Sequence, residues 1–149
     1  MLYEEDRRYF GRYDRLLDGA TEGPVWLSDP RVAEPACEQF RRYDDQAYEL
    51  LAYCVMPNHI HLVFTPRPRA DGRYHALAWI MQQLKGGTAF KANAILGRRG
   101  AFWHHESYDH YARDGRELER IVAYVLNNPV KAGLAESWEE WPWTYWKYA

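Results

Sequence analysis

Two strand candidates separated by only two residues constrain the fold of this chain most. Residues 48–56 and 59–65 are rich in β-branched, aromatic and other apolar residues, a composition typical of strands. Pro57 and Asn58, which lie between them, are a turn signal. Strands joined by so short a turn pair antiparallel. The chain is therefore expected to contain an antiparallel sheet built around this β-hairpin.

Helical patterns surround the β-hairpin. The helices are expected over residues 4–18, 31–43, 75–96 and, after an Asp114 N-cap, 115–128. Gly86-Gly87 interrupts the third of these, a further strand is expected over 106–112, and Pro129 is expected to end or kink the last helix. Helices that alternate with antiparallel strands predict an α+β fold. We expect one domain over residues 1–149 with helices packed on the sheet.

A pair of histidines begins the second strand of the β-hairpin. Side chains alternate between the two faces of a strand, so His59 and His61 point to one side and Ile60 points to the other. Two imidazoles on one face are spaced to chelate a single ion, although this short pattern is also common by chance. Imidazole suits manganese, zinc, nickel or copper better than magnesium.

Tyr124 lies on a helix but away from its apolar stripe. The stripe consists of Leu118, Ile121, Val122, Val125 and Leu126. At the helical spacing, Tyr124 is roughly 130° from the centre of the stripe, and Asn128 is only about 40° from Tyr124. The Tyr124 side chain is therefore not directed into the core, and it shares a helix face with the Asn128 carboxamide. The pattern fits a functional site and also fits a partly exposed tyrosine that packs on another element.

Positive charge is concentrated in one segment. The chain has a formal net charge of −2, yet residues 67–99 carry seven Lys/Arg and one acid, a net of +6. Steering of a polyanion depends on the local field rather than on the total charge. This segment is therefore a candidate for nucleic-acid contact, and a solvated charged helix fits the charge equally well.

Composition narrows the class of protein. No run approaches the roughly 18 apolar residues of a membrane span, and the N-terminus lacks the basic-then-apolar pattern of a signal peptide. Cys37 and Cys54 lack zinc-ligand spacing and form no disulfide framework. We expect a cytoplasmic protein with no membrane partner.

Two longer motifs resemble those of a known family. Residues 53–63 read YCVMPNHIHLV and resemble the His-hydrophobe-His signature of single-tyrosine HUH transposases. Residues 124–134 read YVLNNPVKAGL and resemble the tyrosine helix of the same proteins. The segments AFW at 101–103 and WPW at 141–143 resemble the IS200-like subgroup called REP-associated tyrosine transposases.

The resemblance implies a ferredoxin-like sheet and a DNA-nicking and DNA-joining enzyme. Tyr124 would attack a phosphate of single-stranded DNA, leaving a 5′-phosphotyrosine and a free 3′-hydroxyl. His59, His61 and Asn128 would hold a divalent ion, Mg²⁺ or Mn²⁺. The implied substrates are DNA hairpins such as repetitive extragenic palindromes, and both a monomer and a homodimer stay open.

The basic segment supplies the expected DNA contacts. Lys85, Lys91, Arg98 and Arg99 are expected to contact phosphates. Trp103 is expected to stack on an unpaired base.

The chain departs from the family pattern at its start. Family members begin with a β-strand that is central in the ferredoxin-like order, whereas residues 4–18 are expected to be helical here. That first strand is therefore expected to be missing, which would leave backbone groups of the sheet unpaired.

Two other functions compete with the strand-transfer enzyme. One is a non-catalytic protein, derived from a transposase, that binds nucleic-acid hairpins. The other is a metal-dependent hydrolase that uses the histidines with a water nucleophile, in which Tyr124 would be dispensable.

Overall fold

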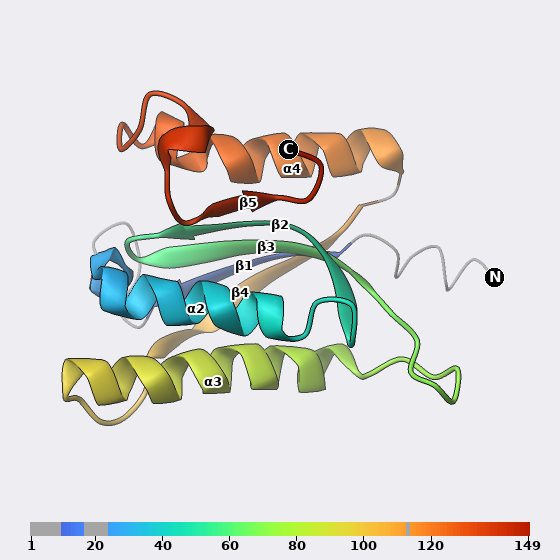
Figure 1. The fold of residues 1–149 in the computed structure, drawn as a ribbon, viewed down its shortest axis with the longest axis horizontal. Helices are drawn as coiled ribbons and strands as arrows, with labels where there is room; N and C mark the ends of the chain where they lie inside the picture. The colour runs from blue at the N-terminus through green and yellow to red at the C-terminus, as the bar shows by residue number, and fades with distance from the viewer. Residues whose placement is uncertain (1–9, 17–23, 113) are drawn as a thin grey trace.

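Five strands form one sheet in the order β4-β1-β3-β2-β5, and each strand pairs antiparallel with its neighbours in the sheet (Figure 1). The computed structural model describes residues 10–16, 24–112 and 114–149, with the backbone alone for 10–16 and 104–111. The strands are β1 (Phe10–Leu16), β2 (Tyr48–Met56), β3 (His59–Pro66), β4 (Trp103–Tyr111) and β5 (Thr144–Trp146). The predicted β-hairpin is thus confirmed as β2 and β3.

The prediction of a missing first strand is wrong. Phe10–Leu16, expected to be helical, forms β1 between β3 and β4 and pairs with both. This segment is short and polar, and its apolar residues Phe10, Tyr13 and Leu16 recur every third position, closer to the helical period than to the strand period of two. Two ladders of backbone hydrogen bonds with distant strands therefore decide its conformation. The rest of the expected helix, residues 4–9 and 17–18, lies outside the described residues.

With β1 in place, the strands and helices up to β4 follow the β-α-β-β-α-β order of the ferredoxin-like fold. Helices α2 (Pro30–Arg42) and α3 (Leu77–Leu96) cover one face of the sheet, and α4 (Gly115–Lys131) covers the other (Figure 1). Within the described ranges, no helix combines the length and apolarity needed to cross a bilayer.

The faces of β3 divide the core into two layers. Ile60, Leu62 and Phe64 are buried in the cluster that includes residues of α2 and α3. Val63 is buried in a smaller cluster with residues of α4. The histidines alternate with the first set, so strand geometry directs them toward α4.

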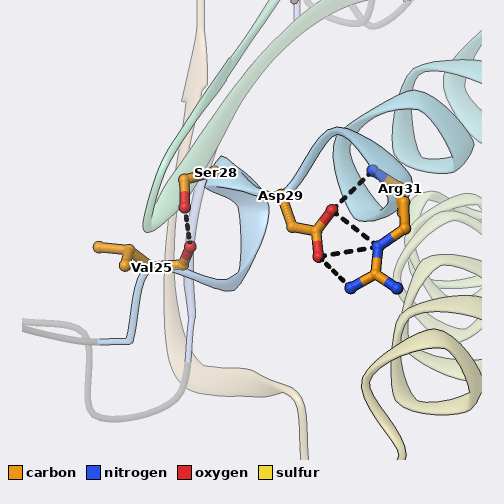
Figure 2. Close-up of polar contacts among 4 residues, drawn as sticks. All are labelled: Val25, Ser28, Asp29 and Arg31. Carbon is orange, nitrogen blue, oxygen red and sulfur yellow. Dashed lines mark hydrogen bonds and ion pairs between the residues drawn. The ribbon is translucent and has the colours of Figure 1, made fainter.

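Helix α2 begins at a well-defined cap (Figure 2). The Asp29 carboxylate accepts the Arg31 backbone N–H at 2.9 Å and forms an ion pair with its guanidinium at 2.7 Å. The hydrogen bonds from Arg31 lower the pKa of Asp29 below its usual value. Ser28 Oγ donates to the Val25 carbonyl at 2.6 Å in the preceding turn. Pro30 occupies the first helical turn, where its missing N–H costs nothing.

Helix α4 starts as expected and ends later than expected. The Asp114 side chain accepts the Glu117 N–H at 2.9 Å, which confirms the N-cap. The helix passes through the buried Pro129 and ends at Lys131, so of the two expected effects of Pro129, termination is wrong, while a kink stays a prediction. Proline removes one backbone donor from the helix. Because Pro129 is close to the end of the helix, few backbone hydrogen bonds are affected.

The C-terminal segment covers the outer edge of β2. Trp141 Nε1 donates to the Val55 carbonyl at 2.9 Å, and the Val55 N–H donates to the Trp143 carbonyl at 2.9 Å. Strand β5 continues this contact by pairing with β2. The tail aromatics therefore serve packing and protect an edge that would otherwise expose unpaired backbone groups.

A buried glutamine joins α2 to α3. Gln39, only 3% exposed, donates through Nε2 to the Gln83 carbonyl at 3.0 Å and accepts from Lys91 Nζ at 3.5 Å. A Cβ added to Gly87 would lie 2.1 Å from Gln39 Nε2, whereas one added to Gly86 would meet nothing within 4 Å. Helix α3 runs unbroken through both glycines, which corrects the expected interruption.

We predict opposite effects of alanine at these neighbouring glycines. Gly87→Ala displaces the Gln39 amide from its partners and should lower the free energy of unfolding by about 1–3 kcal/mol. Gly86→Ala should raise it by about 0.5–1 kcal/mol, because alanine favours the helix and the site has room. Urea denaturation of both variants measures this. Equal effects of the same sign would contradict the role given to Gln39.

Candidate active site

The two histidines lie side by side on the face of the sheet that α4 covers. Their ring centroids are 5.0 Å apart and the ring planes are perpendicular, at 90°. His61 is buried, with 4% of its surface exposed, and His59 is half-buried. The predicted common orientation of this pair is therefore confirmed, and the pair forms a compact group of two imidazoles.

Asparagine side chains orient both rings. Asn58 Oδ1 lies 2.7 Å from His59 Nδ1, and Asn128 Nδ2 lies 2.9 Å from His61 Nε2. A carbonyl oxygen only accepts hydrogen bonds and an amide NH₂ only donates them. These contacts fit a tautomer with the proton on Nδ1 in both rings, in which Asn58 Oδ1 accepts from His59 and Asn128 Nδ2 donates to His61. This tautomer leaves the lone pair on Nε2, the form in which an imidazole binds a metal.

Helix α4 brings Tyr124 to the histidines. Burial of Val122, Val125 and Leu126 fixes the rotation of the helix, and Tyr124 is 56% exposed, as its position off the apolar stripe predicted. The Tyr124 ring packs edge-to-face on His61, with centroids 5.5 Å apart and planes at 87°. An accessible phenol thus lies beside the imidazole that Asn128 also contacts.

The donor set around the histidines is neutral. Within the described residues, no three His, Cys, Asp or Glu side chains gather in a way that could hold a metal, so a third donor here is the Asn128 amide. Cys54 pairs with His61 in the β2–β3 ladder, and burial raises the pKa of its thiol to about 12. The thiol is therefore protonated at neutral pH and is a poor ligand. Two imidazoles and one amide oxygen form a mixed nitrogen and oxygen donor set, which fits a divalent transition-metal ion.

Comparison with known proteins identifies the family. The family model described as Transposase IS200 like matches residues 29–128, which is more than half of the chain. The chain belongs to the IS200-like transposases. The match includes both histidines, Tyr124 and Asn128.

Two curated proteins that are similar to this chain are named as REP-associated tyrosine transposases. It is 28% identical over 102 residues to a putative REP-associated tyrosine transposase of Haemophilus influenzae, covering 65% of this chain and 58% of that protein. It is 26% identical over 102 residues to a REP-associated tyrosine transposase of Escherichia coli, covering 67% of this chain and 55% of the other. The chain thus spans a little over half the length of these curated relatives.

Solved structures share the fold. A REP-associated tyrosine transposase bound to a REP hairpin superposes with a TM-score of 0.68 and 19% identity, over 93% of this chain and 76% of the other. A putative transposase from Deinococcus radiodurans gives 0.51 and 18%, over 80% of this chain and 88% of the other. Both comparisons support the ferredoxin-like architecture.

The residues expected to contact DNA lie on another side of the protein. Lys85 and Lys91 are on α3, and Arg98 and Arg99 follow its end, so all four lie with the helical layer across the sheet from Tyr124. Arg98 donates to Asn93 Oδ1 at 2.8 Å and stacks on Trp26 at 3.9 Å, which ties down the end of α3. Arg99 is exposed. Phosphate contact by these residues stays a prediction.

The expected role of Trp103 is wrong. Its side chain is buried, with 8% exposed, and its Nε1 donates to the Lys85 carbonyl at 3.0 Å. Phe102 packs edge-to-face against it at 5.1 Å. The indole is therefore a core residue and offers no free face to a base. Its position beside the basic segment did not reveal this burial.

Three polar residues near the site were not identified from the sequence. Asn58 was interpreted only as a turn residue, although its place next to the histidine pair was a usable signal. Lys131 Nζ lies 6.0 Å from the centroid of the Tyr124 ring. Arg120, one helical turn before Tyr124, is exposed. The spacing of both cations from Tyr124 was also visible in the sequence.

We predict that both histidines adopt the Nδ1–H tautomer in the metal-free protein. Long-range ¹H–¹⁵N correlation spectra distinguish the two ring nitrogens and measure this directly. In Asn58→Ala, His59 loses the acceptor for its Nδ1 proton and should become a mixture of tautomers, while His61 should be unchanged. An unaltered His59 spectrum in this variant would contradict the orienting role of Asn58.

Proposed function

We propose that this chain nicks and rejoins single-stranded DNA through a covalent bond between Tyr124 and a 5′-phosphate. The observation that carries the proposal is the contact of Tyr124 and Asn128 with His61. Tyr124 and Asn128 from one helix and the two histidines from a distant strand thereby form a single site. This assembly is what a metal-assisted phosphoryl transfer requires.

The proposed substrate is hairpin or palindromic-repeat DNA. Support comes from the solved relative whose structure was determined with a REP hairpin bound, and from two REP-associated relatives. The chain spans only part of the length of those relatives, so the substrate is proposed from family membership and not from a match to the whole relatives.

In the proposed reaction, Tyr124 Oη forms a bond to phosphorus while the bond from phosphorus to the 3′ oxygen breaks. The phenolic proton leaves, and the departing 3′ oxygen takes up a proton. A later 3′-hydroxyl can attack the phosphotyrosine in the reverse sense, so strands are rejoined without an external energy source. A phenol has an ordinary pKa near 10, so the site must favour loss of this proton.

Three side chains would hold the divalent ion, proposed as Mg²⁺ or Mn²⁺. His59 and His61 would bind through Nε2, and Asn128 would bind through Oδ1 after its amide turns over from the present hydrogen bond to His61. When bound, such an ion supplies a Lewis acid that stabilises charge developing on the phosphate oxygens. Asn58 would keep His59 in the metal-binding tautomer.

We predict that Tyr124→Phe abolishes the covalent protein–DNA adduct and leaves binding nearly intact. The variant loses only a hydroxyl and keeps the ring against His61. The assay is a denaturing gel with labelled hairpin DNA and Mn²⁺, in parallel with a binding measurement.

The competing functions predict different results for cleavage and adduct formation on this gel. If wild-type protein cleaves and Tyr124→Phe cleaves equally well, water is the nucleophile and the tyrosine mechanism is wrong. If wild-type protein binds hairpin DNA but forms no adduct with Mn²⁺ on any tested hairpin, the chain is a binding protein.

Asn128→Ala is expected to weaken Mn²⁺ binding by at least about tenfold, because it removes one of three donors. Isothermal titration calorimetry of the DNA-free protein measures this. Asn127→Ala is the matched control, since Asn127 is the exposed neighbour on the same helix and should leave the affinity unchanged. Equal affinities of the two variants would exclude Asn128 as a ligand.

A further inference from the structure

Two exposed cations lie on the same face of α4 as Tyr124. Arg120 precedes Tyr124 by four residues, and Lys131 follows it by seven. At the helical spacing these offsets place them about 40° and about 20° from Tyr124 around the axis. Lys131 Nζ lies 6.0 Å from the Tyr124 ring centroid, which confirms the shared face. The exposed nucleophile is therefore bracketed by positive charge along the helix.

No acidic side chain neutralises these cations among the described residues. Neither Arg120 nor Lys131 forms an ion pair there, in contrast to Arg31 and Lys147, which do. Of the acids on α4, Glu117 lies about 20° from Tyr124 by its spacing, but its side chain is buried, with 8% exposed. Glu119 is exposed, but its spacing places it about 140° from Tyr124. The face that presents Tyr124 is thus cationic although the chain as a whole is acidic.

The spacing of the cations along α4 suits a strand of nucleic acid. With a rise of about 1.5 Å per residue, Arg120 lies about 6 Å along the axis on one side of Tyr124 and Lys131 about 10 Å on the other. Long flexible side chains extend this reach further. Backbone phosphates flanking a central one therefore come within range of both cations.

We infer that Arg120 and Lys131 bind the DNA backbone phosphates on either side of the phosphate that Tyr124 attacks. The identity of the central phosphate rests on the proposed function, whereas phosphate binding by the cations requires no cleavage. Both are positioning residues, which align the strand along α4 and place the scissile bond at Tyr124. The cations on α3 do not provide this alignment, because α3 lies across the sheet from α4.

The salt dependence of DNA binding tests this inference. The probe is a fluorescein-labelled oligothymidylate, since phosphate contacts are independent of sequence, and all variants carry Tyr124→Phe to prevent reaction. Each of Arg120→Gln and Lys131→Gln should lower the slope of log affinity against log salt by about 0.7, and the pair by about 1.4. The charge-preserving Arg120→Lys and Lys131→Arg should retain the full slope.

Arg42→Gln is the matched control. Arg42, like Lys131, is a cation in the last turn of a helix, but α2 packs on the opposite face of the sheet. Arg42→Gln removes a favourable interaction with the C-terminal end of the helix dipole, as Lys131→Gln does. It should nevertheless leave the slope unchanged. Unchanged slopes for Arg120→Gln and Lys131→Gln, or an equal fall for Arg42→Gln, would overturn the inference.

A second measurement separates this inference from the proposed chemistry. The parent protein should bind an oligothymidylate with neutral methylphosphonates more weakly than the ordinary oligothymidylate. On the methylphosphonate DNA, the double variant should bind no more weakly than the parent protein. If no adduct ever forms but the slopes fall as expected, the cleavage proposal fails and the phosphate contacts stand. If adducts form normally and the slopes do not change, cleavage stands and the phosphate contacts are refuted.

Discussion

The packing of α4 against β2 and β3 is the interaction on which the site depends. Val122, Val125 and Leu126 are buried against the sheet, and this burial fixes how the helix is rotated. With the helix in this rotation, Tyr124 and Asn128 both contact His61. A helix turned by one residue, about 100°, would carry both away from the histidines. Hydrophobic burial thus sets the geometry of a polar site that contributes little burial itself.

Local structure was predictable where neighbours in sequence determine it. The β-hairpin, the Asp114 cap and the orientation of Tyr124 follow from short-range rules, and all three are confirmed. Strand β1 could not be identified in this way, because its conformation comes from pairing with strands more than forty residues away. The spacing of its few apolar residues is closer to the helical period, and long-range hydrogen bonding overrides that local pattern.

The DNA contacts show a related limit. Charge along the sequence identified a basic segment at 67–99, but it could not show that α3 lies across the sheet from Tyr124. The same charge pattern suggested that the neighbouring Trp103 is accessible to DNA, although the indole is buried and hydrogen-bonded. Linear charge density reports neither the face nor the depth of a side chain. Helical spacing from Tyr124 does report the face, and it leads to Arg120 and Lys131.

The same geometry decides which substitutions separate chemistry from stability. Tyr124 is 56% exposed, so removing its hydroxyl disturbs little packing. His61 is 4% exposed and is hydrogen-bonded to Asn128, so its replacement leaves a half-buried amide without this partner. A His61 variant therefore mixes loss of a possible ligand with loss of folding free energy. Because the face of β3 that carries the histidines also carries the core residue Val63, the least ambiguous tests of function are substitutions of exposed residues on α4.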